Sequence, residues 1–189
     1  MQTNSALSNK ILISRNTVLS QTLWITAFAL ATALGARIEI PHLPVPYTLQ
    51  TFFVLLAGAF LGARNGALSM ILYLAIGALG APVFSLGGFG LLKFVGPTGG
   101  YLIAFPVVAA IVGLLTENYK SYFGVAVSMF AGLMVLFLAG TAHLYAFYVH
   151  DFGSAFNAGF MIFSVWDLVK LFAAASIYSQ VAKRWPRLT

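Results

Sequence analysis

The chain has 189 residues, of which 60% are hydrophobic and only 7% charged, with a formal net charge of +6. A soluble domain carries about 25% charged residues, so this composition cannot cover a water-facing surface and indicates an integral membrane protein. The absence of cysteine excludes disulfides, thiolate metal sites and cysteine nucleophiles. The basic residues flank apolar segments and form no patch interleaved with aromatic side chains, which argues against nucleic-acid binding.

Six apolar segments follow in chain order, and the sequence predicts an all-α protein with six transmembrane helices in one compact bundle. The segments cover residues 19–35, 48–63, 66–81, 99–116, 122–148 and 154–182. A spanning helix needs roughly 20 residues, with about 17 the usual minimum, so the second segment is marginal. The stretch LGARNGA between the second and third segments is short, and we expect these two helices to be antiparallel neighbours.

The basic residues predict the orientation of these spans. With six spans both termini share one side, and seven basic residues fall there against two opposite: Lys10, Arg15, Arg64, Lys120, Lys183, Arg184 and Arg187 against Arg37 and Lys93. Cytoplasmic loops carry the excess of Lys and Arg, so both termini are expected to be cytoplasmic. We expect a cytoplasmic N-terminal segment over 1–18, too polar for a cleaved signal peptide. A six-helix membrane domain over 19–182 and a basic cytoplasmic tail over 183–189 complete the predicted organisation.

Two loops that this topology places outside have unusual compositions. The first, RIEIPHLPVPYTLQ, has three prolines, and the second, GALGAPVFSLGGFGLLKFVGPTGGY, has eight glycines. Irregular backbone at membrane depth occurs only where it is buried in protein or lines a cavity. We therefore expect the two loops to act as lids over the opening of one cavity. The alternative is that they are ordinary turns without a ligand role.

Several kinds of chemistry have no support in the sequence. GPTGG lacks the Lys-Ser/Thr ending of a phosphate loop, and SLGGFG does not follow a soluble strand, so neither ATP hydrolysis nor dinucleotide binding is expected. The spacing of His42, His143, His150 and the four acidic residues is not that of a metal site. An intramembrane protease built on Ser128 or Ser164 with His143 is an alternative that no nucleophile motif supports. We therefore predict that the protein is not an enzyme.

The apolar stretch FSVWDLVKLF carries Asp167 and Lys170 three residues apart, on one side of a predicted helix. A charge at the bilayer centre costs about 2.5–3.5 kcal/mol, and such residues usually mark a substrate or ion route. A purely structural ion pair is the alternative. Asp accepts N–H hydrogen bonds and Lys attracts a carboxylate. The ligand is therefore expected to be small and partly apolar, with N–H donors and an anionic end. The aromatic side chains available as walls for its apolar part are Phe84, Phe89, Phe94, Tyr101 and Trp166.

Four motifs, PVPYTLQTFFVLLAGAFLG, GAPVF, GPTGGYL and WDLVK, occur in the order and spacing of a known family. The chain resembles the biotin-specific substrate-binding (S) components of energy-coupling factor (ECF) transporters, the BioY family, over nearly its whole length from about Leu23. The resemblance implies biotin uptake through a multi-pass protein of a bacterial-type cytoplasmic membrane. Biotin would bind from outside, between the outer loops and the last helices.

The resemblance also implies roles for individual residues. Asp167 and Lys170 match the family's polar pair, with Asp167 on the ureido N–H groups and Lys170 on the valerate carboxylate, although the sequence leaves open which end each one meets. Where some relatives carry an Asn in the glycine loop and an Arg after GGY, this chain has Gly88, Phe89 and Leu102, and Lys93 is a candidate substitute cation. The expected ligand site comprises Asp167, Lys170, Gln50, Thr48, Phe89, Lys93, Tyr101 and Trp166.

A stripe of small residues, Ala27, Ala31 and Gly35, recurs every four residues in the first helix and lets another helix approach closely. Internal packing is the alternative use of this stripe. The resemblance favours docking, since the family works with a membrane scaffold subunit and two cytosolic ATPases. It implies no cofactor, with biotin as ligand. An S component for another vitamin, an intramembrane enzyme, and a channel or structural membrane protein remain the competing functions.

Overall fold

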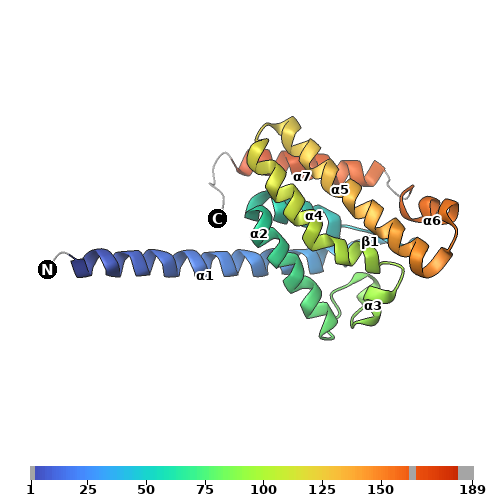
Figure 1. Ribbon diagram of the computed structural model, residues 1–189, viewed down its shortest axis with the longest axis horizontal. Helices are drawn as coiled ribbons and strands as arrows, with labels where there is room; N and C mark the ends of the chain where they lie inside the picture. Colours follow the sequence, from blue (N-terminus) through green and yellow to red (C-terminus); the bar gives the residue numbers. More distant parts are fainter. Residues whose placement is uncertain (1–2, 162–164, 183–189) are drawn as a thin grey trace.

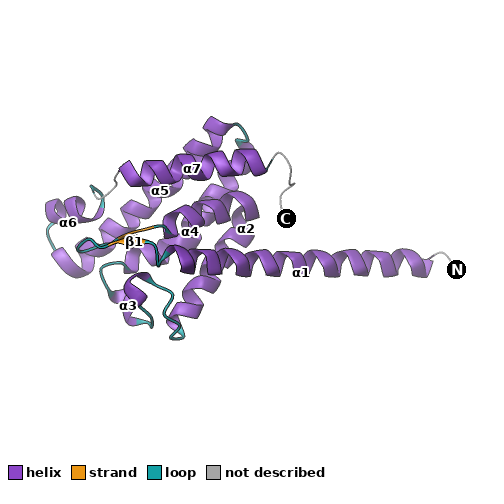
Figure 2. Cartoon of the chain, turned by 180° about the vertical axis from the view of Figure 1, so that it is seen from behind, coloured by secondary structure: helices purple, strands orange, loops and turns teal. Residues whose placement is uncertain are grey.

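The computed structural model describes residues 3–161 and 165–182, with side chains from Val18 onward, and it is almost entirely helical (Figure 1). In chain order the elements are α1 (Thr3–Gly35), β1 (Glu39–Ile40), β2 (Tyr47–Thr48), α2 (Gln50–Ala78), the 3₁₀ turn η1 (Ser85–Gly87), α3 (Leu92–Val95), α4 (Gly99–Asn118), α5 (Tyr122–Leu144), the π-helix η2 (Tyr145–Val149), α6 (Phe152–Gly159) and α7 (Val165–Val181). Figure 2 shows the short antiparallel β1–β2 pair beside the helices.

The centre of the bundle is the packing of α2 against α4, where glycine allows backbones to touch. A Cβ on Gly58 would lie 2.4 Å from the Ala109 carbonyl oxygen, and one on Gly113 would lie 2.3 Å from the Ala63 nitrogen. Larger residues at these two positions would push the helices apart. Helix–helix association in lipid depends on such close contacts, because lipid removes the hydrophobic force that packs helices in water.

Helix α2 folds back on itself at Gly62, where φ is +75°, a conformation that glycine adopts without strain. Gln50 Nε2 donates a hydrogen bond to the Tyr73 hydroxyl across 23 residues of sequence. A straight helix would separate these residues by about 34 Å. The two arms of α2, residues 50–61 and 63–78, therefore turn within the LGARNGA stretch, where the sequence predicts the break between two segments.

The predicted last segment, 154–182, is wrong as a single helix. It contains the end of α6 and the whole of α7, and α6 stops at Gly159 because three helices meet there. A Cβ on Gly159 would lie 2.9 Å from Thr141 Cα of α5, and the Tyr101 hydroxyl of α4 donates to the Gly159 carbonyl at 2.7 Å. The predicted segment 122–148 likewise changes character at Tyr145, where α5 gives way to a π-helix.

Helix α6 begins with a side-chain cap. The exposed carboxylate of Asp151 accepts a 2.7 Å hydrogen bond from the Ser154 N–H. This hydrogen bond favours the ionised form and lowers the pKa of Asp151. The start of α6 is thus encoded locally, whereas its end depends on its neighbours.

Four helices of the described chain are long and apolar enough to cross a membrane, within Val18–Gly35, Gln50–Ala78, Gly99–Asn118 and Tyr122–Val149. Helix α1 begins well before the predicted residue 19 and extends beyond the other helices (Figure 1). The basic residues expected in the tail, Lys183, Arg184 and Arg187, lie outside the described residues. The prediction of six spans with cytoplasmic termini stays a prediction.

Candidate functional site

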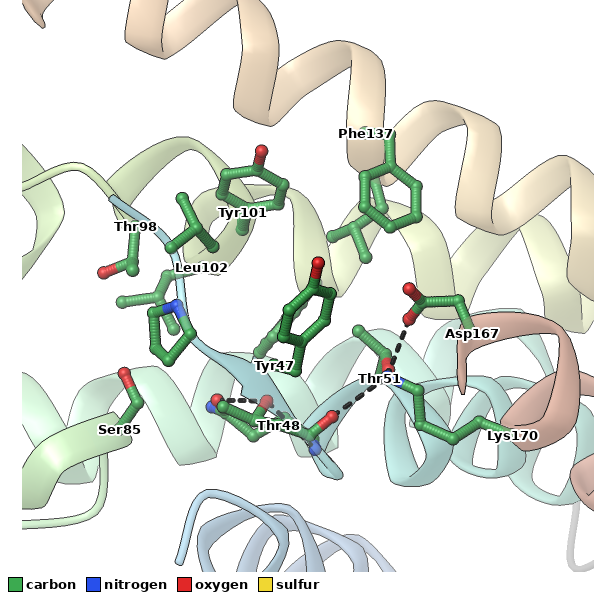
Figure 3. A pocket seen from close by; sticks show the side chains of 15 residues that line it. Tyr47, Thr48, Thr51, Ser85, Thr98, Tyr101, Leu102, Phe137, Asp167 and Lys170 are labelled. Carbon is green, nitrogen blue, oxygen red and sulfur yellow. Dashed lines mark hydrogen bonds and ion pairs between the residues drawn. The ribbon is translucent and has the colours of Figure 1, made fainter. Parts of the chain in front are cut away.

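A pocket of about 560 Å³, including its open mouth, lies between the first loop, the start of α2, the start of α4, the middle of α5 and the start of α7 (Figure 3). Its lining consists of Val45, Pro46, Tyr47, Thr48, Gln50, Thr51, Ser85, Thr98, Tyr101, Leu102, Phe105, Leu136, Phe137, Asp167 and Lys170.

One end of the pocket carries a buried ion pair. Lys170 Nζ lies 2.7 Å from Asp167 Oδ1, and both side chains come from α7. Asp167 is only 3% exposed. A buried charge is costly unless it is paired and hydrogen-bonded, and this close pair gives the buried Asp167 carboxylate such a partner at the pocket wall.

Lys170 also bonds to the segment that leads from β2 into α2. Its ammonium donates to the Thr48 carbonyl at 3.0 Å and to Thr51 Oγ1 at 2.8 Å. Together with the Asp167 carboxylate, these are three acceptors for one ammonium group, which has three N–H donors. The ion pair is therefore part of a bridge between α7 and the first loop.

The polar network continues from Thr48 to the far side of α2. The Thr48 hydroxyl donates to Gln50 Oε1 at 2.9 Å, while Gln50 Nε2 donates to the Tyr73 hydroxyl. That hydroxyl in turn donates to the Val83 carbonyl at 3.0 Å, in the glycine-rich loop. A chain of hydrogen bonds thus runs from the pocket wall to the second loop, and its buried members are satisfied.

The two loops also contact each other directly. The Arg37 guanidinium donates to the Pro82 carbonyl, and both carboxylate oxygens of Glu39 accept from the Leu86 N–H, at 3.0 and 3.2 Å. The second loop is tied to the π-helix after α5 as well, since the Tyr148 hydroxyl donates to the Val95 carbonyl at 2.8 Å. The loops expected to be lids are joined to each other close to the pocket.

The opposite end of the pocket has polar groups of a different kind. Ser85 is 6% exposed, and no hydrogen bond in the described part of the chain uses its hydroxyl. Thr98 stands immediately before α4, and its side chain forms no capping hydrogen bond. Figure 3 shows Ser85 and Thr98 on one side of the pocket and Asp167 with Lys170 on the other.

Apolar and aromatic side chains occupy the space between these ends. Tyr47, Tyr101 and Leu102 lie between the two polar groups in Figure 3. The hydroxyl of Tyr101 is directed to the Gly159 carbonyl, so the pocket meets mainly its ring. The arrangement suits an elongated ligand with an apolar middle and a polar group at each end.

Eight ligand-site residues were predicted from the sequence, and five of them line this pocket: Asp167, Lys170, Gln50, Thr48 and Tyr101. The other three lie outside the lining. Phe89 and Trp166 are 59% and 58% exposed, and Lys93 folds over Gly88, where an added Cβ would lie 1.9 Å from Lys93 Cε.

Several lining residues were not predicted from the sequence, among them Thr51, Ser85, Thr98 and Phe137. Thr51, Ser85 and Thr98 lie in the stretches TLQTF, SLGGFG and GPTGG, so the motifs that stood out in the sequence already contained these polar lining residues. Phe137 lies in the uniformly apolar middle of α5, where the sequence alone does not separate pocket-facing from lipid-facing positions.

The small-residue stripe of α1 is divided by the fold. Gly35 is buried, and a Cβ there would lie 2.8 Å from Phe53 Cδ2 and 3.1 Å from the Leu49 carbonyl. Gly35 therefore serves internal packing against α2. Ala31 is half-buried and Ala27 is exposed, so the upper part of the stripe, which is its N-terminal part, is not covered by other helices of this chain.

The described residues do not come together as the alternative protease or metal sites would require. Ser128 and His143 both belong to α5, 15 positions apart, which places them about 22 Å from each other. His143 Nε2 instead lies 3.1 Å from the Gly96 carbonyl. Ser164 lies outside the described residues. No group of three His, Cys, Asp or Glu side chains within the described ranges could hold a metal ion.

The fold is that of a solved transporter component. The structure matches the crystal structure of the S-component for biotin from an ECF-type ABC transporter with a TM-score of 0.83 and 22% sequence identity, covering 92% of this chain and 95% of that one. An all-helical membrane protein with the S-component fold is thus the class to which the chain belongs.

Sequence comparisons make this assignment finer. The family model described as BioY family matches residues 4–187. A relative from Thermotoga maritima, named biotin transporter BioY, is 42% identical over 82% of this chain and 92% of its own length. One from Pyrococcus horikoshii, named probable biotin transporter BioY, is 40% identical over 81% and 90%. The chain belongs to the BioY family, and both of these relatives are named as transporters and not as enzymes.

Proposed function

We propose that this protein is the biotin-binding S component of an ECF-type importer. The observation that carries the proposal is the pocket beneath the two joined loops, which has a carboxylate at one end, hydroxyls at the other and aromatic walls between. Family membership and the names of the relatives support the same ligand. Biotin itself has a urea at one end, an apolar bicycle with an alkyl chain, and a carboxylate at the other end.

We infer that the ureido ring lies at the Asp167 end. A buried carboxylate is an acceptor, and the two ureido N–H groups are donors that need partners once they leave water. The valerate carboxylate would then lie at the Ser85 and Thr98 end, where hydroxyl donors and the N-terminus of α4 favour an anion. Lys170 is a poorer partner for that carboxylate, since its three donors are already used within the protein.

We further propose six membrane crossings, formed by α1, the two arms of α2, α4, α5 and α7, with both termini in the cytoplasm. The fold-back at Gly62 supports counting α2 as two crossings. Single cysteines can test the sidedness, because the chain has none of its own. A cysteine at Leu43 should react with an impermeant thiol reagent in intact cells, and one at Lys120 only after the cells are opened; the reverse pattern would overturn the orientation.

ATP hydrolysis would come from separate subunits, a membrane scaffold and two cytosolic ATPases, and the exposed upper part of the α1 stripe would contact the scaffold. Ala27→Leu should then reduce energised uptake and co-purification with the scaffold, while the isolated protein keeps its affinity for biotin. Unchanged uptake and co-purification would mean that Ala27 faces lipid and does not contact the scaffold.

The experiment that tests the function is a calorimetric titration of the purified protein with biotin, thiamine and riboflavin. We expect saturable binding of biotin and no binding of the other two vitamins. Tight binding of thiamine or riboflavin, or no heat with any of the three, would overturn the assignment.

A further inference from the structure

The π-helix η2 follows α5 directly and brings one of its side chains to the same face as a side chain of α5. In an α-helix, His143 and Tyr148 would lie about 140° apart around the axis, because each residue turns by about 100°. A π-helix closes hydrogen bonds between residues five apart and therefore winds more slowly. Here the rings of His143 and Tyr148 are neighbours, with their centroids 6.3 Å apart. Single turns of π-helix are frequent at functional sites.

Both side chains bond to one place in the second loop. The Tyr148 hydroxyl donates to the Val95 carbonyl at 2.8 Å, and His143 Nε2 lies 3.1 Å from the Gly96 carbonyl. A carbonyl oxygen only accepts, so His143 Nε2 carries the proton and donates it. Val95 and Gly96 are consecutive residues at the end of α3. Two neighbouring carbonyls of the second loop are therefore held from the end of α5 and the π-helix that continues it.

The glycine pair of GPTGG provides the space in which His143 sits. A Cβ on Gly100 would lie 2.4 Å from His143 Cβ, and one on Gly99 would lie 3.0 Å from His143 Nε2. A side chain at either position would push the imidazole away from the Gly96 carbonyl. The imidazole also packs against Phe147 of η2, with ring centroids 4.7 Å apart. The ring thus contacts both the start of α4 and the π-helix, and these contacts fix the direction of its N–H group.

We propose that His143 and Tyr148 form a clamp that holds the second loop closed over the pocket and sets the rate at which the ligand enters and leaves. The clamped carbonyls lie two and three residues before Thr98 of the pocket lining, and the same loop carries Ser85. Neither clamp residue is among the side chains that line the described pocket, so both are positioning residues that act on the loop. This inference rests on the proposed biotin-binding function.

Tyr148→Phe tests the clamp by keeping the ring and removing the hydroxyl donor. The closed loop keeps this hydrogen bond with and without ligand, and the open loop lacks it. Loss of the bond should therefore make both association and dissociation of biotin about three- to tenfold faster in stopped-flow measurements, while Kd changes by less than about twofold. Unchanged rates would overturn the proposal. So would faster dissociation alone with weaker binding, because that result marks support of the bound ligand.

The matched control is Tyr145→Phe in the same π-helix, whose hydroxyl makes no hydrogen bond within the described part of the chain. It should leave both rates as they are in the wild type. An acceleration equal to that of Tyr148→Phe would show that the effect comes from a loosened π-helix and not from the bond to Val95, and would overturn the clamp.

The second clamp residue allows a rescue experiment. His143→Leu removes the N–H donor, so it should accelerate biotin exchange about three- to tenfold as well. His143→Gln carries an amide N–H at a similar distance from the backbone and should bring both rates back toward the wild type. Exchange as fast in His143→Gln as in His143→Leu would contradict a role for the bond to Gly96.

A measurement without ligand separates the clamp from the proposed function. The chain has no cysteine, so Ser85→Cys introduces a single thiol at a position that is only 6% exposed. A methanethiosulfonate reagent reaches such a thiol when the loop opens, so the labelling rate reports the open fraction. Adding Tyr148→Phe should speed labelling about three- to tenfold, and adding Tyr145→Phe should not. Equal rates in all three proteins would overturn the clamp, whereas faster labelling in a protein that binds no biotin would refute the proposed function alone.

Discussion

The two ends of the pocket differ in how their polar groups are supported. At the α7 end, Asp167 and Lys170 belong to a continuous hydrogen-bond network with Thr48 and Thr51. At the other end, the Ser85 hydroxyl has no protein partner among the described residues, and it sits in a short turn of the glycine-rich loop. The polar groups at the α7 end are hydrogen-bonded to one another, whereas the Ser85 hydroxyl at the other end is available to donate to a ligand.

The difference shows what each end can contribute to binding. A group fixed by its neighbours loses little conformational freedom when a ligand arrives, so the Asp167 end suits recognition of a rigid ring. A hydroxyl rotates to suit its partner and tolerates a flexible ligand tail. We expect substitutions at the first end to affect all biotin analogues, and substitutions at the second end to depend on the carboxylate.

The largest effect should come from Asp167→Asn, which removes the charge that pairs with Lys170 and that we propose as the acceptor for the ureido N–H groups. A hydrogen bond to a charged group contributes about 1.5–3 kcal/mol, so affinity should fall roughly 10- to 100-fold. Calorimetry should find the same factor for biotin and biotinamide. Asp151→Asn is the matched control, because Asn also caps a helix and Asp151 lies outside the pocket; wild-type affinity in Asp167→Asn would contradict the assignment.

A smaller and selective effect is expected from Ser85→Ala. Loss of one hydroxyl donor should weaken biotin binding about three- to tenfold. Biotinamide should lose less, since its neutral end depends less on a donor. Ser69→Ala is the control, as the Ser69 hydroxyl donates to the Gly66 carbonyl within α2. Equal losses for acid and amide would show that the carboxylate lies elsewhere in the pocket.

The smallest effect should follow Glu39→Gln, which weakens the contact between the two loops without changing the pocket lining. A neutral amide oxygen accepts the Leu86 N–H less strongly than a carboxylate. Both association and dissociation of biotin should become about two- to threefold faster, with little change in affinity. Stopped-flow measurements would check this, and unchanged rates would mean that the loops do not limit exchange.

The sequence indicated the polar residues of the site better than its geometry. Asp167 and Lys170 stood out because charges are rare in an apolar helix. Thr48 and Gln50 were expected only because they belong to the motif PVPYTLQTFF that resembles the family. The bond between Lys170 and Thr51 could not be read from the chain, because it joins residues 119 positions apart. The end of α6 at Gly159 was missed for the same reason, since it depends on contacts with Thr141 and Tyr101.

The fold-back of α2 determines what sets the width of the pocket mouth. The first loop enters α2 at Gln50, the second leaves it at Ala78, and the Gln50–Tyr73 hydrogen bond holds the two arms together near these ends. One end of each loop is therefore fixed by the same folded-back helix, whatever the number of residues in either loop. Loop length is free to vary without resizing the rim, so a peptide tag inserted beside Gly80, where an added side-chain atom would meet no neighbour within 4 Å, should leave the aperture as it is.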